Sequence, residues 1–436
     1  MAKRLIIRNG RFAQLGADSK QTTLQGFMVV EEDRIVYVGE TLPSEYAADD
    51  AEEMDGSRLF FMPGLVNTHG HAAMTLLRGY GDDMVLQEWL QNKMWPMEAK
   101  FTDQDVCAGT ALAVLEMLKT GTTTFVDMYD HMNEVAKVCE QSGIRAALMR
   151  GAIGLCSEEV QQQKLQEAVQ FAKDWNHAAN GRITTMLAPH APYTCPPAFI
   201  EKFVQAAHDL DLMLHTHMSE TEAEVQQNVT DYGLRPVAHL EKLGFFSRPS
   251  FVAHAVHLTD EEIEVLAKYN VGVSHNPASN LKLASGVARI PDLMRAGVQV
   301  SLGTDGAASN NNLDMFDEMR LTALIHKGVS GDPTAVPAAE AMRIATVNGA
   351  KMIQLQDVGL LEAGMKADFI AINIDQPHLL PHTDLVSHMV YSATGRDVAH
   401  VFVDGKHIVK DGQCLTMDEE RIRDEAARAF EGLLTR

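Results

Sequence analysis

The chain has 436 residues, of which 46% are hydrophobic and 22% are charged, and its formal net charge is −22. This composition is that of a globular protein, and no apolar run is long enough to cross a membrane. Nucleic acids and anionic lipid surfaces attract basic patches, so the negative charge argues against both as partners. We expect a neutral or zwitterionic small-molecule substrate, and a homo-oligomer is compatible with the sequence.

The N-terminal segment, residues 1–10, has basic residues but no apolar stretch of signal-peptide length with a cleavage site after it. We therefore expect a cytoplasmic protein. The five cysteines are widely scattered and form no Cys-x-x-Cys pair. Neither a disulfide framework nor a thiolate zinc site of the cytidine-deaminase type is indicated.

Both ends of the chain have the sequence pattern of short strands separated by turns. An Asp-Gly dipeptide at Asp404-Gly405 is a two-residue hairpin signal. We predict that the two ends fold together as one small β unit, and that a helix follows over 418–434. The candidate strands are 5–10, 28–30, 34–39, 367–372 and 401–409.

Between these ends, short β-branched runs alternate with longer helical segments, which is the pattern of parallel strands joined by crossover helices. We predict an α/β barrel whose strand ends open onto one rim, where the active sites of that fold lie. Each candidate strand runs from apolar residues into a polar one. The strand ends are Asn67-Thr68-His69, Phe125-Val126-Asp127, Leu148-Met149-Arg150, Leu187-Ala188-Pro189-His190, Leu214-His215-Thr216-His217, Val252-Ala253-His254, Val273-Ser274-His275 and Leu302-Gly303-Thr304-Asp305.

Two His-x-His pairs stand at the predicted rim. His69 and His71 follow the first strand, and His215 and His217 belong to the fifth. Residues two apart on a strand point to the same side, so each pair can present two imidazoles. Imidazoles with a carboxylate such as Asp305 suit one divalent first-row metal ion, zinc first, with iron, manganese or cobalt as alternatives. Spacing alone does not choose between His215 and His217.

Four segments contain strand-end histidines or Asp305: Pro63–His71, Leu214–Glu220, Phe251–Leu258 and Ser301–Gly306. These segments resemble the amidohydrolase superfamily, and most closely its 5-methylthioadenosine/S-adenosylhomocysteine deaminases. The resemblance implies a (β/α)8 TIM barrel over residues 63–365, with a small β-sandwich built from residues 1–62 and 366–436. It also implies a mononuclear centre, because the fourth strand ends without the lysine that binuclear members use as a bridge.

The resemblance also implies a role for each site residue. Glu220 would shuttle protons, His254 would hold the attacking water, and Asp305 would accept the proton of that water. Glu98, Arg150 and His190 would bind the substrate, together with Glu220 and Asp305. The implied metal ligands are His69, His71, His217 and Asp305.

Several alternatives stay open at this point. His215 is either a packing residue or a ligand, and His257 competes with His254 for the role at the sixth strand. The apolar segment 84–98 is either a pocket wall or a dimer contact. Some members carry a second arginine a dozen or so residues after the one at Arg150. None occurs between Gly151 and Gly181, which favours methylthioadenosine over S-adenosylhomocysteine.

The leading interpretation is hydrolytic deamination of an adenosine-type nucleoside to its inosine analogue and ammonia by a metal-activated water. Candidate substrates are 5′-methylthioadenosine, S-adenosylhomocysteine, adenosine and 5′-deoxyadenosine. Guanine deamination, triazine dechlorination and cyclic amide hydrolysis would use much the same site, and the fold cannot exclude them. A binding protein without catalysis is the non-enzymatic alternative.

Overall fold

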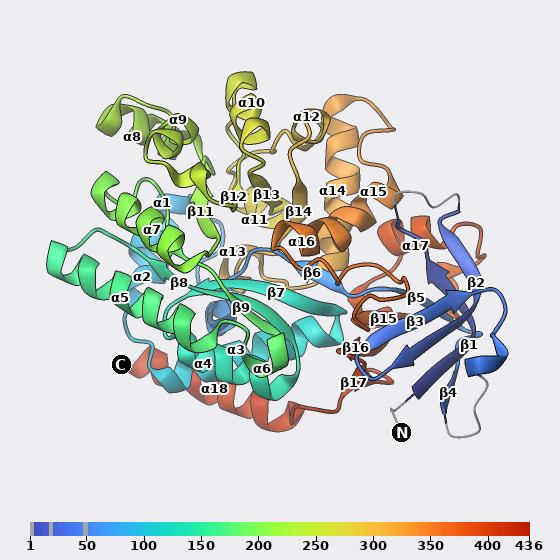
Figure 1. Cartoon of the computed structure of the whole chain (residues 1–436). Coiled ribbons are helices and arrows are strands. Elements are labelled where there is room, and N and C mark those ends of the chain that lie inside the picture. The colour runs from blue at the N-terminus through green and yellow to red at the C-terminus, as the bar shows by residue number, and fades with distance from the viewer. Residues whose placement is uncertain (1–3, 17–20, 47–50) are drawn as a thin grey trace.

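The computed structural model describes residues 4–16, 21–46 and 51–436 of the chain. A parallel barrel forms its centre, with helices around it (Figure 1). Each crossover returns the chain to the start of the next strand, so all strand ends meet at one rim. The barrel strands are β6 (Leu65–Asn67), β7 (Thr122–Tyr129), β8 (Arg145–Ala152), the short pieces β9 (Ile183–Thr185) and β10 (Ala188–Pro189), β11 (Leu214–Met218), β12 (Ser250–His254), β13 (Gly272–His275) and β14 (Val300–Leu302).

The barrel consists of two hydrogen-bonded arcs, β10-β8-β7-β6 with β9 beside β8, and β11-β12-β13-β14. A parallel bridge between Leu187 and Leu214 joins the arcs on one side. On the other side, the Thr68 amide donates to the Leu302 carbonyl over 2.8 Å. The predicted α/β barrel is confirmed, and every predicted strand end lies in or directly after one of these strands.

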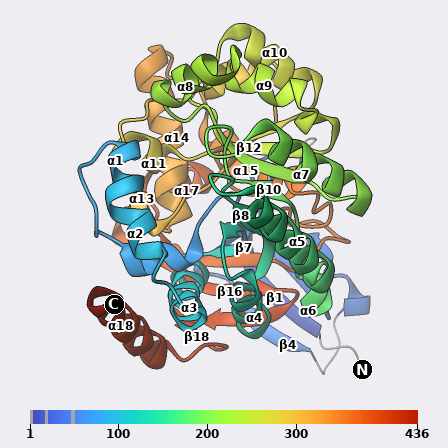
Figure 2. The same cartoon turned by 90° about the vertical axis from the view of Figure 1, so that its left-hand side faces the viewer.

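The outer helices begin at polar caps and bury one face. The Thr102 side chain caps α3 in a reciprocal pair with Asp105, and Thr259 caps α10 with Glu262. Figure 2 shows several of these helices from the side on which α5 and α8 lie. The outer helices are α3 (Asp103–Lys119), α4 (Met132–Ser142), α5 (Glu158–Trp175), α6 (Ala178–Gly181), α7 (Pro197–Leu210), α8 (Glu222–Tyr232), α9 (Pro236–Lys242), α10 (Asp260–Lys268), α12 (Ile290–Arg295), α14 (Met315–Ser330), α15 (Ala338–Ile344) and α16 (Val347–Met352).

Short helices follow several barrel strands and carry residues of the site. Two of them follow β13 and β14, and the longest excursion follows β6. These loops place polar side chains above the closed barrel, because the interior of the barrel itself is filled. They are η2 (Ala72–Leu77), α1 (Leu86–Trp89), the π-helical turn η3 (Leu90–Met94), α2 (Trp95–Glu98), α11 (Pro277–Lys282) and α13 (Ala307–Asn310).

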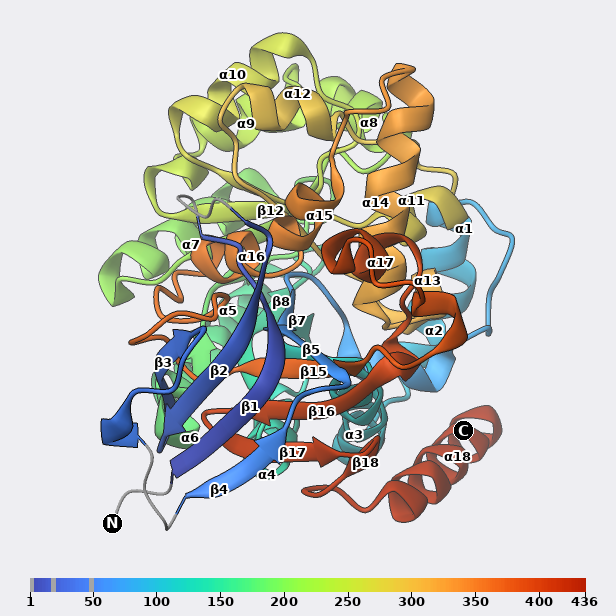
Figure 3. The ribbon, with the colours of Figure 1, turned by 90° about the vertical axis from the view of Figure 1, so that its right-hand side faces the viewer.

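Strands from both ends of the chain join in one nine-stranded sheet beside the barrel (Figure 3). β5 and β15 pair antiparallel at the junction, and β16 and β17 form the hairpin predicted at Asp404-Gly405. The sheet buries an aromatic cluster that includes Phe12, Phe61, Phe369 and Phe402. Its strands are β1 (Arg4–Ala13), β2 (Thr23–Glu31), β3 (Arg34–Gly39), β4 (Glu52–Asp55), β5 (Leu59–Pro63), β15 (Phe369–Asn373), β16 (Val398–Val403), β17 (Lys406–Lys410) and β18 (Gln413–Cys414).

The predicted small β unit of both termini is thus present, although residues 1–3, 17–20 and 47–50 of its N-terminal segment lie outside the described part. We keep the division into residues 63–365 and the two flanking segments as a proposal. Buried Arg145 of β8 ties the barrel to the sheet, with its Nε 2.7 Å from Asp368 Oδ2. A buried arginine needs such an acid partner, because its charge stays in place.

The predicted C-terminal helix is present as α18 (Glu419–Thr435), which packs on α3. Arg436 anchors its end, with Nη2 2.8 Å from both carboxylate oxygens of Asp105. Three short helices connect β15 to β16: η5 (Pro377–Leu379), α17 (Leu385–Tyr391) and η6 (Gly395–Asp397). Within the described residues, no helix has both the length and the apolar character needed to cross a membrane.

Candidate active site

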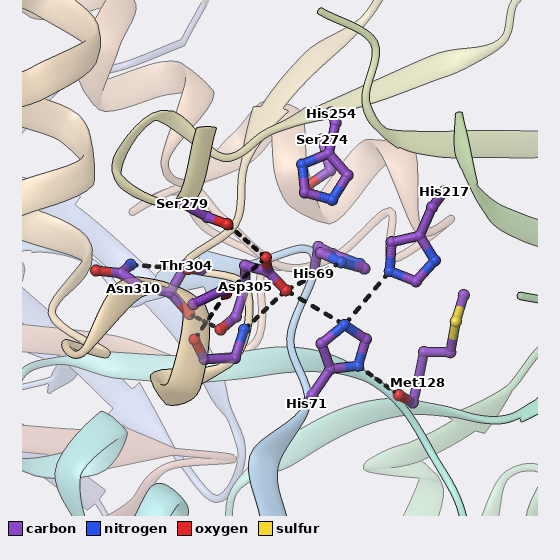
Figure 4. A network of polar contacts seen from close by, with 12 residues as sticks. His69, His71, Met128, His217, His254, Ser274, Ser279, Thr304, Asp305 and Asn310 are labelled. Atoms are coloured by element: carbon purple, nitrogen blue, oxygen red, sulfur yellow. Dashed lines mark hydrogen bonds and ion pairs between the residues drawn. The ribbon is translucent and has the colours of Figure 1, made fainter. Parts of the chain in front are cut away.

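Three histidines and an aspartate converge above the barrel (Figure 4). His69 and His71 follow β6, His217 lies in β11, and Asp305 follows β14. The Nε2 atom of His71 is 3.2 Å from Asp305 Oδ1 and 3.3 Å from His217 Nε2. His69 Nε2 lies 3.5 Å from the same Asp305 oxygen. Residues far apart in the sequence therefore share one small volume.

In two of these rings, hydrogen bonds determine that Nδ1 carries a hydrogen. His71 Nδ1 lies 2.6 Å from the Met128 carbonyl oxygen, and His217 Nδ1 lies 2.7 Å from the His190 carbonyl oxygen. A carbonyl only accepts, so each Nδ1 must carry the hydrogen. In the neutral ring the lone pair then lies on Nε2, which faces the centre of the cluster.

A chain of two bonds fixes His69 in the same way. His215 Nδ1 donates to the Phe251 carbonyl oxygen over 3.0 Å, which leaves His215 Nε2 as an acceptor when the ring is neutral. That atom lies 3.0 Å from His69 Nδ1, which therefore donates to it. The Nε2 atom of His69 is buried and has no hydrogen-bond partner among the described residues.

The donor set fits a divalent metal ion. Three imidazole lone pairs and one carboxylate oxygen face one another, and the orphaned Nε2 of His69 is the kind of buried atom that a ligand must satisfy. The backbone after β14 also lies very close to His69. A Cβ added at Gly303 would be only 2.8 Å from the His69 Cβ. The glycine permits β14 to approach this histidine.

Asp305 is fixed by donors from two short helices. Its Oδ2 accepts from Ser279 over 2.7 Å and from Ser309 over 2.8 Å, and its Oδ1 accepts from the Gly306 amide. Burial alone would raise its pKa, but the adjacent imidazoles of His69 and His71 hold that pKa well below its usual range. At His71 the contact with Asp305 outweighs burial and raises the pKa of that ring to about 9. A cation is therefore favoured here.

His254 and Glu220 face each other beside the metal-ligand candidates. His254 Nε2 lies 3.7 Å from Glu220 Oε2, and His254 Nδ1 lies 2.8 Å from the Asn280 side-chain oxygen. An amide oxygen accepts, so Nδ1 carries the hydrogen and Nε2 is free to accept. Burial raises the pKa of Glu220, so its carboxyl keeps a proton to a higher pH than an exposed glutamate does.

The backbone at these strand ends is strained. His254 has a φ of 72°, and Asp305 has a φ of 61°. Such left-handed conformations are rare for residues other than glycine and cluster at functional sites. The Glu224 carboxylate supports the neighbouring loop by accepting from the Ser219 and Glu220 amides over 2.9 and 2.7 Å.

A cavity of about 630 Å³ opens above the cluster. Every residue predicted for the site lines it except His69, which lies beneath. The 84–98 segment lines it as well, so this segment is a pocket wall. The apolar lining includes Leu86, Trp89, Leu90, Trp95, Phe101, Ile153 and Leu155.

Two predicted substrate-binding residues on the cavity wall, Glu98 and Arg150, already contact other protein side chains. Tyr129 donates to Glu98 Oε1 over 2.8 Å. Arg150 lies 2.8 Å from Glu167 and 3.3 Å from Asp130, so its charge is already matched.

His190 is a neutral ring at the end of the fourth strand. Its Nδ1 lies 2.9 Å from the Thr194 hydroxyl, and burial lowers its pKa to about 3. Since Thr194 can donate to the Ala191 carbonyl, this arrangement favours His190 Nε2 as an acceptor.

The two open histidine questions have structural answers. His215 lies behind His69, buried and stacked on Phe251, and does not belong to the cluster of possible ligands. His257 does not line the cavity, because its Nε2 lies 2.7 Å from the Ser285 carbonyl and its Nδ1 faces Glu222. His254 is therefore the histidine at the sixth strand that reaches the site.

Sequence reasoning missed the supporting residues of the site. Ser279, Asn280, Ser285 and Ser309 hold the candidate residues but come from loops and short helices. Glu224 supports the site from the first turn of α8. Serines and asparagines of this kind are common in loops. Only the fold shows which of them turn toward the rim.

The model of the amidohydrolase family matches residues 60–408. The chain belongs to the amidohydrolase family. It is 50% identical over 404 residues to 5-methylthioadenosine/S-adenosylhomocysteine deaminase of Halalkalibacterium halodurans, which covers 92% of each chain. It is 46% identical over 432 residues to 5′-deoxyadenosine deaminase of Methanosarcina mazei, which covers 99% of each. The predicted hydrolase acting on C–N bonds and the resemblance to these deaminases are confirmed.

Solved structures share the whole architecture. A zinc-bound adenosine deaminase from Xanthomonas campestris superposes with a TM-score of 0.90 at 34% identity and covers 99% of both chains. Atrazine chlorohydrolase from Arthrobacter aurescens TC1, complexed with zinc, gives 0.90 at 25% identity and covers 98% of this chain and all of the other. Together with the His/His/His/Asp cluster, these amidohydrolase neighbours indicate a metal site.

Proposed function

We propose that this protein is a metal-dependent deaminase that converts adenosine-type nucleosides to their inosine analogues and ammonia. The observation that carries the proposal is the pairing of Glu220 with His254 beside three inward-facing imidazoles, in a cavity large enough for a nucleoside. The names of the relatives support the same substrate class.

We propose one zinc ion as the resident metal, held by His69, His71, His217 and Asp305. Iron, manganese and cobalt suit the same donors. When bound, such an ion supplies Lewis acidity that lets water ionise near neutral pH. The fourth-strand position ends in His190, without a bridging lysine, which supports a single ion.

The chain's own residues would manage the protons. Deamination forms a C–O bond at the purine carbon that bears the amino group and breaks the C–N bond there. His254 Nε2 accepts a hydrogen bond from the incoming water, and Asp305 takes its proton. Glu220 gives its proton to the neighbouring ring nitrogen, takes a second one from the hydroxyl newly bonded to the same carbon, and passes it to the amino group, which leaves as ammonia. The proton held by Asp305 then restores that of Glu220. The raised pKa of Glu220 favours the protonated carboxyl from which this donation starts.

The remaining cavity residues would orient the nucleoside. Glu98 can accept from ribose hydroxyls, and His190 can bond the purine. The apolar residues between Leu86 and Leu155 suit an uncharged thioether or deoxy group at the 5′ position, so methylthioadenosine is the proposed first substrate. Lys164 lines the cavity, with its Nζ 2.8 Å from the Ile153 carbonyl oxygen. Its positive charge would pair with the carboxylate of a substrate that has one at its 5′ end.

The direct test is a substrate panel with metal-loaded protein. Methylthioadenosine, S-adenosylhomocysteine, adenosine, 5′-deoxyadenosine, guanine and a chlorotriazine are compared by kcat/KM, with ammonia or chloride release as a second readout. The proposal expects the adenosine nucleosides to be deaminated and the other two to be poor substrates. Turnover of guanine or the triazine alone would overturn it.

A further inference from the structure

One polar contact fastens the 84–98 wall to the barrel. Trp89, Met94 and Met97 of this segment are buried, and the segment is held mainly by apolar packing. Within the described residues, its single side-chain hydrogen bond to another part of the chain joins Tyr129 Oη to Glu98 Oε1 over 2.8 Å. The wall and the barrel rim thus meet at Glu98.

Tyr129 is well placed to hold a carboxylate still. It ends β7 and pairs in register with Arg150 of β8, so its backbone belongs to the barrel. Its ring is buried, with its centroid 6.3 Å from that of Phe101. A phenol on a rigid strand loses little freedom when it donates a hydrogen bond, so its hydroxyl is pre-organised.

The contact leaves Glu98 with one oxygen occupied and one open. No protein hydrogen bond reaches Oε2 among the described residues, and both Glu98 and Tyr129 line the cavity. Burial raises the pKa of Glu98, while the Tyr129 hydroxyl, and more weakly His71, oppose that rise and Asp130 adds to it. The hydroxyl therefore favours the carboxylate, which is the acceptor form.

We propose that Tyr129 is a positioning residue for ribose recognition: its hydroxyl aims Glu98 so that the open oxygen accepts from the vicinal hydroxyls of the nucleoside. The proposal rests on the proposed function, because it takes a ribose as the ligand of Glu98. It requires that Tyr129 act on the substrate only through Glu98.

The test is a cycle over two residues and two substrates. Tyr129→Phe removes only the hydroxyl, Glu98→Ala removes the acceptor, and the double variant combines them. Each is assayed with methylthioadenosine and with its 2′,3′-dideoxy analogue, and the affinity for both nucleosides is measured by calorimetry. Tyr232→Phe, on α8 and outside the cavity lining, is the matched control.

A hydrogen bond to a charged group predicts that Tyr129→Phe lowers kcat/KM for the diol about tenfold and leaves the dideoxy analogue within about twofold. When Glu98 is already alanine, Tyr129→Phe should cause no further loss of kcat/KM. Equal losses for both substrates, additive losses in the double variant, or no loss at all would overturn the role of Tyr129.

Calorimetry separates this proposal from the proposed function. Protein that binds the diol in a Tyr129-dependent manner but deaminates nothing contradicts deamination alone. Protein that deaminates both nucleosides regardless of Tyr129 contradicts this inference alone. Protein that does not distinguish the diol from the dideoxy analogue in binding or in turnover also overturns it.

Discussion

The Nε2 atom of His215 lies 3.0 Å from the Nδ1 atom of His69, and the opposite nitrogen of His215 is bonded to a backbone carbonyl. The carbonyl sets the tautomer of His215, and His215 in turn sets that of His69. The lone pair of His69 is thereby directed to the cluster centre. Spacing alone could not distinguish His215 from a metal ligand, and the structure shows that it orients a candidate ligand, His69.

Replacing His215 with alanine should weaken the metal site without removing a ligand. Loss of the orienting partner typically lowers metal affinity about 10–100-fold. Competition with a chromogenic chelator measures that affinity. His208→Ala, an exposed histidine on α7, is the control. Equal affinities of His215→Ala and the wild type would contradict this account.

Replacing Glu220 with glutamine should abolish proton transfer while keeping the shape of the site. We expect kcat to fall by about 10²–10⁴-fold, since that is the range for a lost general acid–base group. Binding of the nucleoside, measured by calorimetry, should persist. Glu222→Gln, exposed at the start of α8, is the matched control. If Glu220→Gln kept its turnover, another group would have to shuttle the protons.

Glu318 on α14 links the two helices that hold the site. Its Oε2 accepts from the Ala278 amide over 3.2 Å, and its Oε1 accepts from the Asn310 side chain over 2.7 Å. Burial raises its pKa to about 8. The folded chain therefore retains a proton that the unfolded chain loses above its ordinary pKa.

This difference makes stability depend on pH. Between the ordinary value of 4.5 and about 8, the unfolded state binds fewer protons at this residue, so stability should fall as pH rises. Glu318→Gln removes that contribution. Its melting temperature relative to the wild type should rise with pH across this window, with both proteins metal-loaded. A constant difference, like that expected for exposed Glu264→Gln, would show that Glu318 is not protonated.

Lys164→Met tests the 5′ end of the pocket. Lys164 faces the cavity, whereas the charge of nearby Arg150 is matched by Glu167. We expect the variant to raise KM for S-adenosylhomocysteine, which carries a carboxylate, and to leave KM for methylthioadenosine unchanged. Lys173→Met, near the end of the same helix, should change neither. If KM changed equally for both substrates, Lys164 would not contact the carboxylate of S-adenosylhomocysteine.

The barrel could be predicted because short β-branched runs alternate with helical segments along the chain. Polar residues such as His254 and Asp305 follow directly where the apolar runs end. The four metal-ligand candidates could be found for the same reason. Their mutual distances follow from closure of the barrel, which no local pattern encodes. The roles of the site residues, the cytoplasmic location and a homo-oligomer stay predictions.

Contacts made by loops could not be predicted. Tyr129 lies two residues beyond the predicted strand end at Asp127, and its bond to Glu98 depends on how the 84–98 segment folds back over the rim. The same holds for the acceptor side of His190, because the Thr194 hydroxyl determines it. Side-chain partners across loops follow from tertiary packing, and one-dimensional spacing carries little of that information.

The most direct test of the central claim is a metal titration of the deaminase reaction. Protein stripped by a chelator is mixed with increasing Zn²⁺, and the loss of adenine absorbance from methylthioadenosine and the release of ammonia are followed. The account predicts no turnover without metal and a rate that rises to a plateau at one equivalent per chain. Full activity of the stripped protein, or a plateau only at two equivalents, would contradict it.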